Sequence, residues 1–135
     1  MTDAPTEVTP FEALGGEEPV RALAMAFYDA MEQHEPALTK LHRLTPDGLI
    51  DPEVRARFAL FLIGWLGGPQ TYMAVHGHPR LRMRHAMVPI DTAMRDAWHR
   101  SMSRAMDACK IDGPVRTDLE GRFFEVADFL RNVAG

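Results

Sequence analysis

The chain has 135 residues, a mass of 15.2 kDa and a formal net charge of −4. This length fits one ordinary domain, and the 46% hydrophobic and 25% charged residues are typical of globular proteins. These values exclude a disordered chain, a collagen-like chain and a disulfide scaffold. The negative charge, with a pI near 5.8, argues against nucleic-acid binding through a broadly basic surface.

The N-terminus and the cysteine content indicate the compartment in which the protein is expected. Residues 1–10 are polar and contain two prolines, so we expect a flexible tail followed by one domain over residues 11–135. A secretory leader pattern is not visible, and the longest apolar run, Phe58 to Ile63, is far shorter than the roughly 20 residues of a membrane helix. A lone Cys109 cannot form an internal disulfide. We therefore expect a cytoplasmic protein without a membrane partner.

The first predicted helix follows Gly15-Gly16 and opens near Pro19, a residue suited to a first helical turn. Its apolar positions recur every three or four residues: Val20, Leu23, Ala24, Phe27 and Met31. A shorter helical piece is expected over residues 37–44, and the composition of residues 45–48 predicts a turn.

The next predicted helix begins with Asp51 as its cap and Pro52 in its first turn, and it ends at Gly67-Gly68. Its apolar face is wide and contains Val54, Phe58, Leu60, Phe61, Leu62, Ile63, Trp65 and Leu66. We therefore expect this helix to be the most deeply buried of all.

The second half of the chain is less regular over residues 70–90 and then helical. A helix is predicted from Thr92 to about Cys109, and a last helix after Gly113-Pro114, with Thr117 and Glu120 as a capping box. The last helix is expected to bury Leu119, Phe123, Val126, Ala127 and Leu130. Because no stretch alternates with period two, the predicted fold class is all-α.

The histidines between residues 76 and 85 are the first candidates for chemistry. His76 and His78 have neither a cysteine pair nor a His-Glu-x-x-His pattern beside them, so solvated loop residues are favoured over zinc ligands. His85 ends a segment in which arginines alternate with Leu81 and Met83. An imidazole beside arginines suits an anionic haem, although a lone histidine is more often structural.

These residues carry a resemblance to a known family. Three segments resemble the group II truncated haemoglobins, and the likeness extends from about Phe11 to Leu130. The segments are Gly67-Gly68-Pro69-x-Thr71-Tyr72, Gly77-His78-Pro79-Arg80-Leu81-Arg82-Met83-Arg84-His85 and Arg95-Asp96-Ala97-Trp98. The resemblance implies a two-over-two helical globin fold that holds a b-type haem (iron protoporphyrin IX) between its helix pairs.

The resemblance also implies roles for individual residues. His85 matches the iron ligand, and Tyr28, Trp98 and His42 match the polar residues on the opposite, distal side. A phenol O–H and an indole N–H are suitable donors to a bound O2, which carries partial negative charge. The alternatives are core packing for Tyr28 and Trp98 and a solvated side chain for His42.

Other positions of the expected haem pocket are apolar or basic. Val54 and Phe58 occupy the distal positions of their helix and cannot donate a hydrogen bond. The remaining predicted haem contacts are Phe61, Leu62, Tyr72, Arg82 and Arg84. Of these, Arg82 and Arg84 are candidates for the propionates, with Tyr72 as a hydroxyl partner, although charge runs are usually solvated.

Two functions follow from the resemblance, and a third stays open. The first is binding of O2, NO or CO at the haem iron by a monomer or homodimer. The second is a redox enzyme, a nitric oxide dioxygenase or a peroxidase-like protein, that takes electrons from an external reductase. The third is a haem-free helical module for protein interaction.

Overall fold

A computed structural model describes residues 8–134 of the chain, so most of the predicted tail of residues 1–10 lies outside the described residues. Within that range the structure contains eight helices and no strand, which confirms the predicted all-α class. The helices are α1 (Pro10–Leu14), α2 (Glu17–His34), α3 (Pro36–Thr39), α4 (Pro52–Trp65), α5 (Thr71–His76), α6 (Leu81–Arg84), α7 (Thr92–Ala108) and α8 (Gly113–Phe129).

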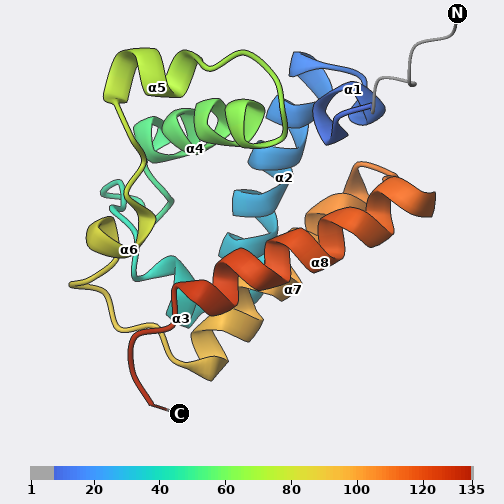
Figure 1. The fold of residues 1–135 in the computed structure, drawn as a ribbon. Helices are drawn as coiled ribbons and strands as arrows, with labels where there is room; N and C mark the ends of the chain where they lie inside the picture. The colour runs from blue at the N-terminus through green and yellow to red at the C-terminus, as the bar shows by residue number, and fades with distance from the viewer. Residues whose placement is uncertain (1–7, 135) are drawn as a thin grey trace, which may run out of the picture.

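Two pairs of long helices make up the body of the molecule. Helix α2 packs against both α4 and α7, and α8 packs against α7. In Figure 1, α4 and α5 lie above α7 and α8, and the segment that carries α6 connects the two layers at one end. This arrangement is the two-over-two helical sandwich that the resemblance implied.

Helix α2 forms the centre of the core. Glu17 and Glu18 stand in its first turn, where negative charge complements the helix dipole. All five of its predicted apolar positions are buried, and Tyr28 is buried with them. The periodic apolar pattern therefore predicted the buried face of this helix correctly.

The expectation that α4 is the most deeply buried helix is wrong. It buries only Ala59, Leu62 and Ile63 within the helix, fewer residues than α2 does. The reason is that several of its other large apolar side chains, Phe58 and Phe61 among them, border a cavity and are therefore only partly covered by protein.

Two helix starts differ from the prediction. Helix α1 was not predicted, yet Thr9 and Glu12 form a reciprocal capping box at its start. Helix α8 begins at Gly113 with Asp112 as its N-cap, so the predicted capping box of Thr117 and Glu120 is wrong. Both residues already lie inside the helix.

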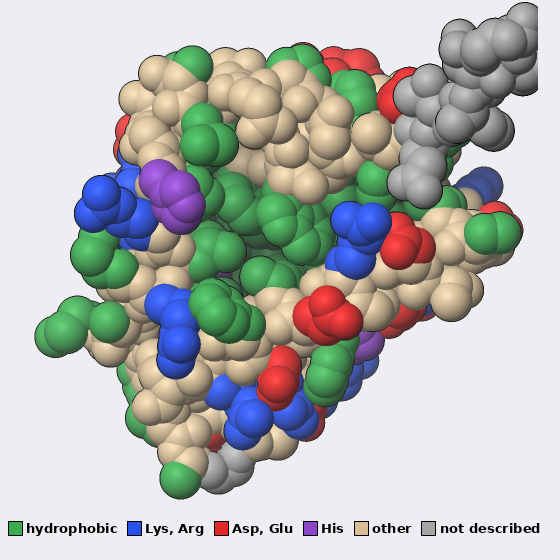
Figure 2. Space-filling model, in the orientation of Figure 1, with side chains coloured by type: hydrophobic (Ala, Val, Ile, Leu, Met, Phe, Trp, Pro, Cys, Tyr) green, Lys and Arg blue, Asp and Glu red, His purple; other side chains and the backbone are tan. Residues whose placement is uncertain are grey.

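The segment between α4 and α7 contains two short helices, where the sequence pattern predicted only irregular structure. Arg80 adopts a left-handed backbone conformation (φ 48°) immediately before α6, and His85 caps the end of α6. No described helix is long and apolar enough to cross a membrane. Figure 2 shows that the molecule is hollowed between the α4–α5 layer and α8, and that hydrophobic side chains line the hollow.

Candidate functional site

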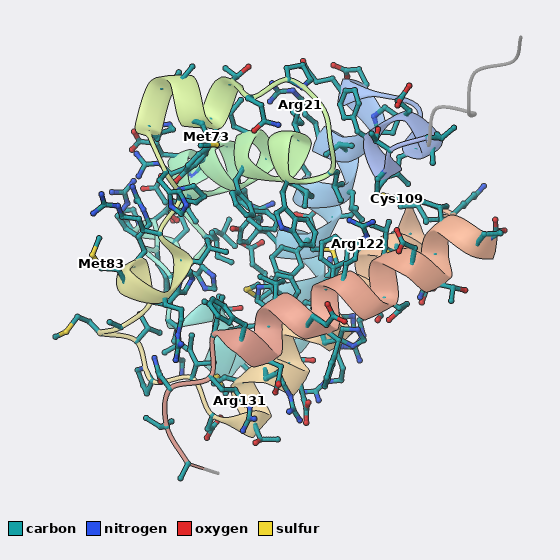
Figure 3. The ribbon with its side chains drawn as sticks, viewed as in Figure 1. Arg21, Met73, Met83, Cys109, Arg122 and Arg131 are labelled. Atoms are coloured by element: carbon teal, nitrogen blue, oxygen red, sulfur yellow. The ribbon has the colours of Figure 1, made fainter. Side chains whose placement is uncertain are left out.

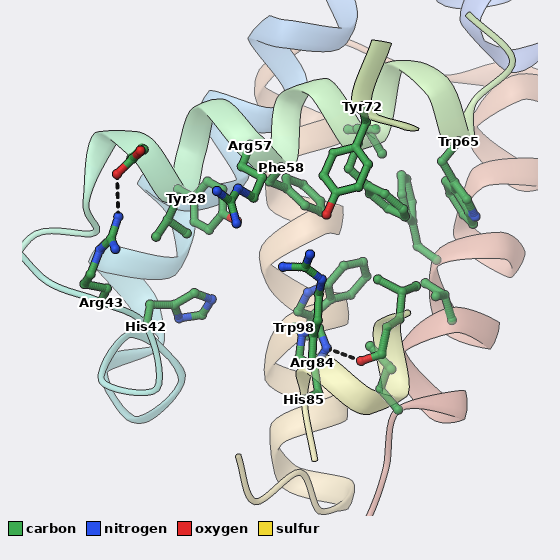
Figure 4. A pocket seen from close by; sticks show the side chains of 18 residues that line it. Tyr28, His42, Arg43, Arg57, Phe58, Trp65, Tyr72, Arg84, His85 and Trp98 are labelled. Carbon is green, nitrogen blue, oxygen red and sulfur yellow. Dashed lines mark hydrogen bonds and ion pairs between the residues drawn. The ribbon is translucent and has the colours of Figure 1, made fainter. Parts of the chain in front are cut away.

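The hollow is a cavity of about 430 Å³ enclosed mainly by α2, α4, α6, α7 and α8. It brings together ten of the eleven predicted site residues (Figure 4): Tyr28, His42, Val54, Phe58, Phe61, Leu62, Tyr72, Arg84, His85 and Trp98. Arg82 is the exception, because it does not line the cavity and its guanidinium lies over the ring of Phe129, 5.0 Å from the centroid.

His85 lies at the C-terminal end of α6 with its ring held by the backbone. Its Nδ1 is 2.6 Å from the carbonyl oxygen of Leu81. Since a carbonyl oxygen only accepts, Nδ1 carries the proton and Nε2 keeps its lone pair. A backbone contact of this kind fixes the ring orientation and the tautomer of metal-binding histidines. His85 is therefore prepared to ligate a metal through Nε2.

Tyr28 comes from α2 and is almost fully buried, with 4% of its surface exposed. Its ring makes edge contacts with Phe27 and Phe58 at centroid distances of 5.0 and 5.5 Å. Burial raises the pKa of the phenol well above its ordinary value, and the nearby Arg55 offsets this only in part. Tyr28 thus stays neutral and keeps its O–H donor at physiological pH.

His42 follows α3 and faces Tyr28 edge-on at a centroid distance of 5.8 Å. Its Nδ1 lies 3.0 Å from the carbonyl oxygen of Leu38, to which it donates. Burial lowers the pKa of the imidazole below its ordinary value. A neutral His42 held in this way offers Nε2 as an acceptor, whereas Tyr28 offers a donor.

Trp98 stands on α7 and lines the cavity. Its ring meets Phe27 edge-on at 5.1 Å and Phe123 at 5.9 Å. Within residues 8–134, no hydrogen bond joins the indole N–H of Trp98 or the hydroxyl of Tyr28 to another residue. Both donors are therefore available to a ligand in the cavity.

The first two turns of α4 give the cavity an apolar wall and one charge. Val54 and Phe58 line it side by side along the helix, and neither carries a polar group. Arg57 lies between them and also lines the cavity. The resemblance did not point to Arg57, although its spacing of three residues from Val54 places both on one helix face.

Sequence reasoning also missed part of the cavity wall. The missed residues beside Arg57 are Arg43, Glu53, Trp65, Leu81, Phe123, Val126 and Leu130. Of these, Phe123, Val126 and Leu130 carry the apolar stripe of α8, and the sequence pattern predicted them as ordinary core. Periodicity identifies an inward face but cannot tell whether that face meets protein or a cavity.

Four arginines differ from all the others in the described part of the chain. Arg57, Arg80, Arg82 and Arg84 form no ion pair there. Every other arginine of residues 8–134 is paired with a carboxylate. Two of the four, Arg57 and Arg84, line the cavity, where their unpaired guanidiniums suit a bound anion.

A second cavity of about 220 Å³ adjoins the first and shares His42, Arg84, His85, Trp98 and Leu130 with it. The two spaces therefore lie on either side of the same group of side chains, His85 among them. An apolar slot with the Nε2 atoms of His85 and His42, two unpaired guanidiniums and two neutral donors fits a flat, anionic metal cofactor. By contrast, no cluster of three or more potential metal-ligating side chains is assembled in residues 8–134.

Comparisons with known proteins identify the family of this chain. The model of the bacterial-like globin family matches residues 9–132. The group 2 truncated hemoglobin YjbI of Bacillus subtilis is 39% identical over 123 residues, which cover 91% of this chain and 88% of the relative.

Solved structures give the same result. The group II truncated hemoglobin from Bacillus anthracis superposes with a TM-score of 0.83 at 32% identity, covering 97% of this chain and 96% of that one. The truncated oxygen-avid haemoglobin from Bacillus subtilis superposes with a TM-score of 0.81 at 36% identity, covering 93% and 100%. The chain belongs to the bacterial-like globin family, among the group II truncated haemoglobins.

Proposed function

We propose that this chain binds a b-type haem in the cavity through His85 and holds O2, NO or CO beside it. The observation that carries the proposal is the state of His85, whose Nδ1 is fixed on the Leu81 carbonyl while the ring lines the cavity. A structural relative, the truncated oxygen-avid haemoglobin from Bacillus subtilis, supports O2 as one ligand. When bound, haem supplies an iron atom that binds such diatomic ligands.

The propionate groups of haem need positive partners at the cavity mouth. Arg57 and Arg84 have guanidiniums without ion pairs and line the cavity, and Tyr72 contributes a hydroxyl from α5. Arg82 lies beside them on α6 but outside the cavity lining. We therefore place the propionates with Arg57, Arg84 and Tyr72, and Arg82 adds only to the positive charge around them.

The opposite wall controls the diatomic ligand. Tyr28 and Trp98 donate hydrogen bonds to the ligand, whereas neutral His42, whose Nδ1–H donates to Leu38, adds no donor and packs against the ring of Tyr28. Val54 and Phe58 exclude water from the same space. The structure of this wall favours slow release of O2, because two neutral donors act on a ligand with partial negative charge.

The test of the proposal is the optical spectrum of the purified protein. Wild type is expected to show a Soret band, alone or after haem is added. His85→Gly is expected to lose most of this band, and added imidazole is expected to restore it by replacing the missing ring. His34→Ala, an exposed histidine at the end of α2, is the matched control and should keep the band unchanged.

A colourless wild type that does not take up added haem would contradict the proposal and favour the haem-free interaction module. A His85→Gly variant that retains the band without imidazole would leave haem binding in place but would remove His85 as the ligand.

A second candidate function is favoured by the two donors, Tyr28 and Trp98, in one cavity. Strong retention of O2 suits nitric oxide dioxygenation better than delivery. Conversion of NO and O2 to nitrate takes one electron per turnover, which a reductase would supply from NADH. With the reductase and NADH present, the dioxygenase function predicts that each haem consumes many equivalents of NO. Consumption of only one equivalent per haem would favour the binding function.

A further inference from the structure

The segment that follows α8 holds the loop that carries His85. Asn132 uses both ends of its side-chain amide for this purpose. Its Nδ2 donates to the carbonyl oxygens of His85 (3.1 Å) and Val88 (2.8 Å), and its Oδ1 accepts from the backbone N–H of Ile90 (2.9 Å). One side chain therefore connects three positions of the loop between α6 and α7.

The backbone of the same segment adds two more hydrogen bonds. The N–H groups of Asn132 and Val133 both donate to the carbonyl oxygen of Ile90, at 2.9 and 3.3 Å. These contacts join residues more than 40 positions apart in the chain. The C-terminal segment is thus attached to the loop by side chain and backbone together.

The loop itself has little else to fix it. Met87 is 93% exposed, and Pro89 has no N–H to donate. The other backbone hydrogen bonds of residues 86–88 are local: Ala86 donates to Met83, and Val88 donates to His85. A loop with few buried contacts opens easily unless tertiary hydrogen bonds hold it.

We propose that Asn132 is a positioning residue for His85. Leu81 fixes the ring of His85 through Nδ1, and Asn132 fixes its backbone through the carbonyl oxygen. The two contacts together define where Nε2 lies in the cavity. Leu130, two residues before Asn132, lines the same cavity, so the end of α8 forms the wall and holds the ligand loop at once. This inference rests on the proposed haem binding through His85.

The chemistry of the site requires an amide at position 132. An aspartate has the same shape and could still accept from Ile90, but it cannot donate to the two carbonyl oxygens and would repel them. An alanine loses the donor and the acceptor together. Because Asn132 is exposed, each hydrogen bond alone contributes modestly. Together they contribute more, because ordering one side chain forms all three hydrogen bonds.

The test compares Asn132→Asp and Asn132→Ala with Arg131→Gln in the haem-loaded protein. Arg131 is the neighbouring residue, labelled in Figure 3, and its side chain is paired with Asp128 instead of the loop. Both Asn132 variants are expected to transfer haem to excess apomyoglobin about tenfold faster than wild type. The iron–histidine stretching band in the resonance Raman spectrum of the ferrous protein is expected to shift or broaden in both variants. Arg131→Gln should match wild type in haem transfer and in this band.

The stretching band separates positioning from general stability, because a loss of global stability alone does not change it. An unchanged band and haem transfer within twofold of wild type, in both Asn132 variants, would overturn the inference. Amide hydrogen exchange of Ile90 gives a readout that needs no haem: it should be faster in both variants. If wild type bound no haem, the proposed function would fail, while this exchange rate would still decide whether Asn132 holds the loop.

Discussion

Two histidines of this chain make the same contact with the backbone but have different surroundings. In both His42 and His85, Nδ1 meets the carbonyl oxygen of the residue four positions earlier. Each ring therefore keeps a lone pair on Nε2. His85 has Arg84 and α6 beside it, whereas His42 faces the phenol of Tyr28. These surroundings, and not the local contact, are the reason that we propose His85 as the iron ligand and His42 as part of the distal wall.

The first prediction concerns the donors to O2. Trp98→Phe removes the indole N–H and keeps an aromatic ring against Phe27. We expect O2 to dissociate about fivefold faster, because one hydrogen bond contributes about 1 kcal/mol. Stopped-flow measurement of O2 dissociation checks this value.

The matched variant for this prediction is His42→Phe. Since neutral His42 has its proton on Nδ1, it cannot donate through Nε2, and we expect a smaller change in O2 dissociation. An unchanged rate in Trp98→Phe together with a large change in His42→Phe would assign the donor to His42 and contradict this interpretation.

At the scale of the elements, the end of α4 depends on two adjacent glycines. The backbone N–H of Phe11 donates to Leu66 at 2.9 Å, which brings α1 against the turn. Gly67 has φ 103°, a left-handed conformation that favours glycine. A Cβ at Gly68 would lie 2.6 Å from the ring of Phe11 and 2.9 Å from the carbonyl oxygen of Ile63. The Gly-Gly pair thus ends α4 and makes room for α1.

The second prediction follows from this close approach. Gly68→Ala is expected to lower the free energy of unfolding by about 1–3 kcal/mol, because Phe11 must move and the Ile63 backbone cannot. Gly121→Ala is the control, since nothing lies within 4 Å of its added Cβ and α8 should gain slightly in stability. Urea unfolding of both variants measures the difference. Equal stabilities would show that α1 does not need this contact.

Glu35 connects the junction of α2 and α3 with α7. Glu35 is only 8% exposed, and its carboxylate accepts two hydrogen bonds from Arg100 at 2.9 Å and one from Arg104 at 3.0 Å. The hydrogen bond from Arg100 is the main reason that the pKa of Glu35 lies below its ordinary value of 4.5. The ion pair fixes α7, which carries Trp98, against the helix that carries Tyr28.

The third prediction is a pH dependence of stability. Because folding lowers the pKa of Glu35, its contribution is fully present above pH 4.5 and is lost as the pH falls through the lower folded pKa. Glu35→Gln should therefore lower the free energy of unfolding by about 1 kcal/mol at pH 7 and by progressively less below pH 4.5. The effect is modest because both arginines are partly exposed.

Urea unfolding at pH 7 and pH 3.5 gives both values. Glu17→Gln, whose partner Arg21 is on the same helix and exposed, serves as the control. A difference between wild type and Glu35→Gln that stays constant across this range would show that the charge of Glu35 does not contribute.

For the whole molecule, the core and the cavity share their walls. Phe58, Phe61 and Trp65 line the cavity on one side and contact the aromatic core on the other. An apolar wall of this size gains stability only when the cavity is filled. We therefore expect folding and haem binding to be coupled in this protein.

The fourth prediction tests that coupling. Removal of haem is expected to lower Tm, because a ligand that binds only the folded state stabilises it by mass action. The loss of hydrogen-exchange protection should be greatest in α4 and α6, which border the cavity, and smallest in α2. Calorimetry and hydrogen exchange of the protein with and without haem measure both effects. Equal Tm values would contradict the coupling.

Much of this architecture was predictable because it depends on local chemistry. The buried face of α2, the Asp51-Pro52 start of α4 and the start of α7 at Thr92 follow from helical periodicity and capping. The resemblance added the remaining step, by pointing to ten of the residues that the fold brings into one cavity. Without it, His85 was one of several histidines in an irregular segment.

Other features arise only from contacts between distant segments. The sequence pattern could not predict that the apolar face of α4 meets a cavity, that Arg57 joins the site, or that Asn132 holds the loop of His85. The sequence by itself determined the four long helices, the fold family and the candidate ligand, since periodicity, caps and motifs are local. The tertiary structure alone decided which inward faces remain unpacked, because packing depends on elements that the chain brings together only when it folds.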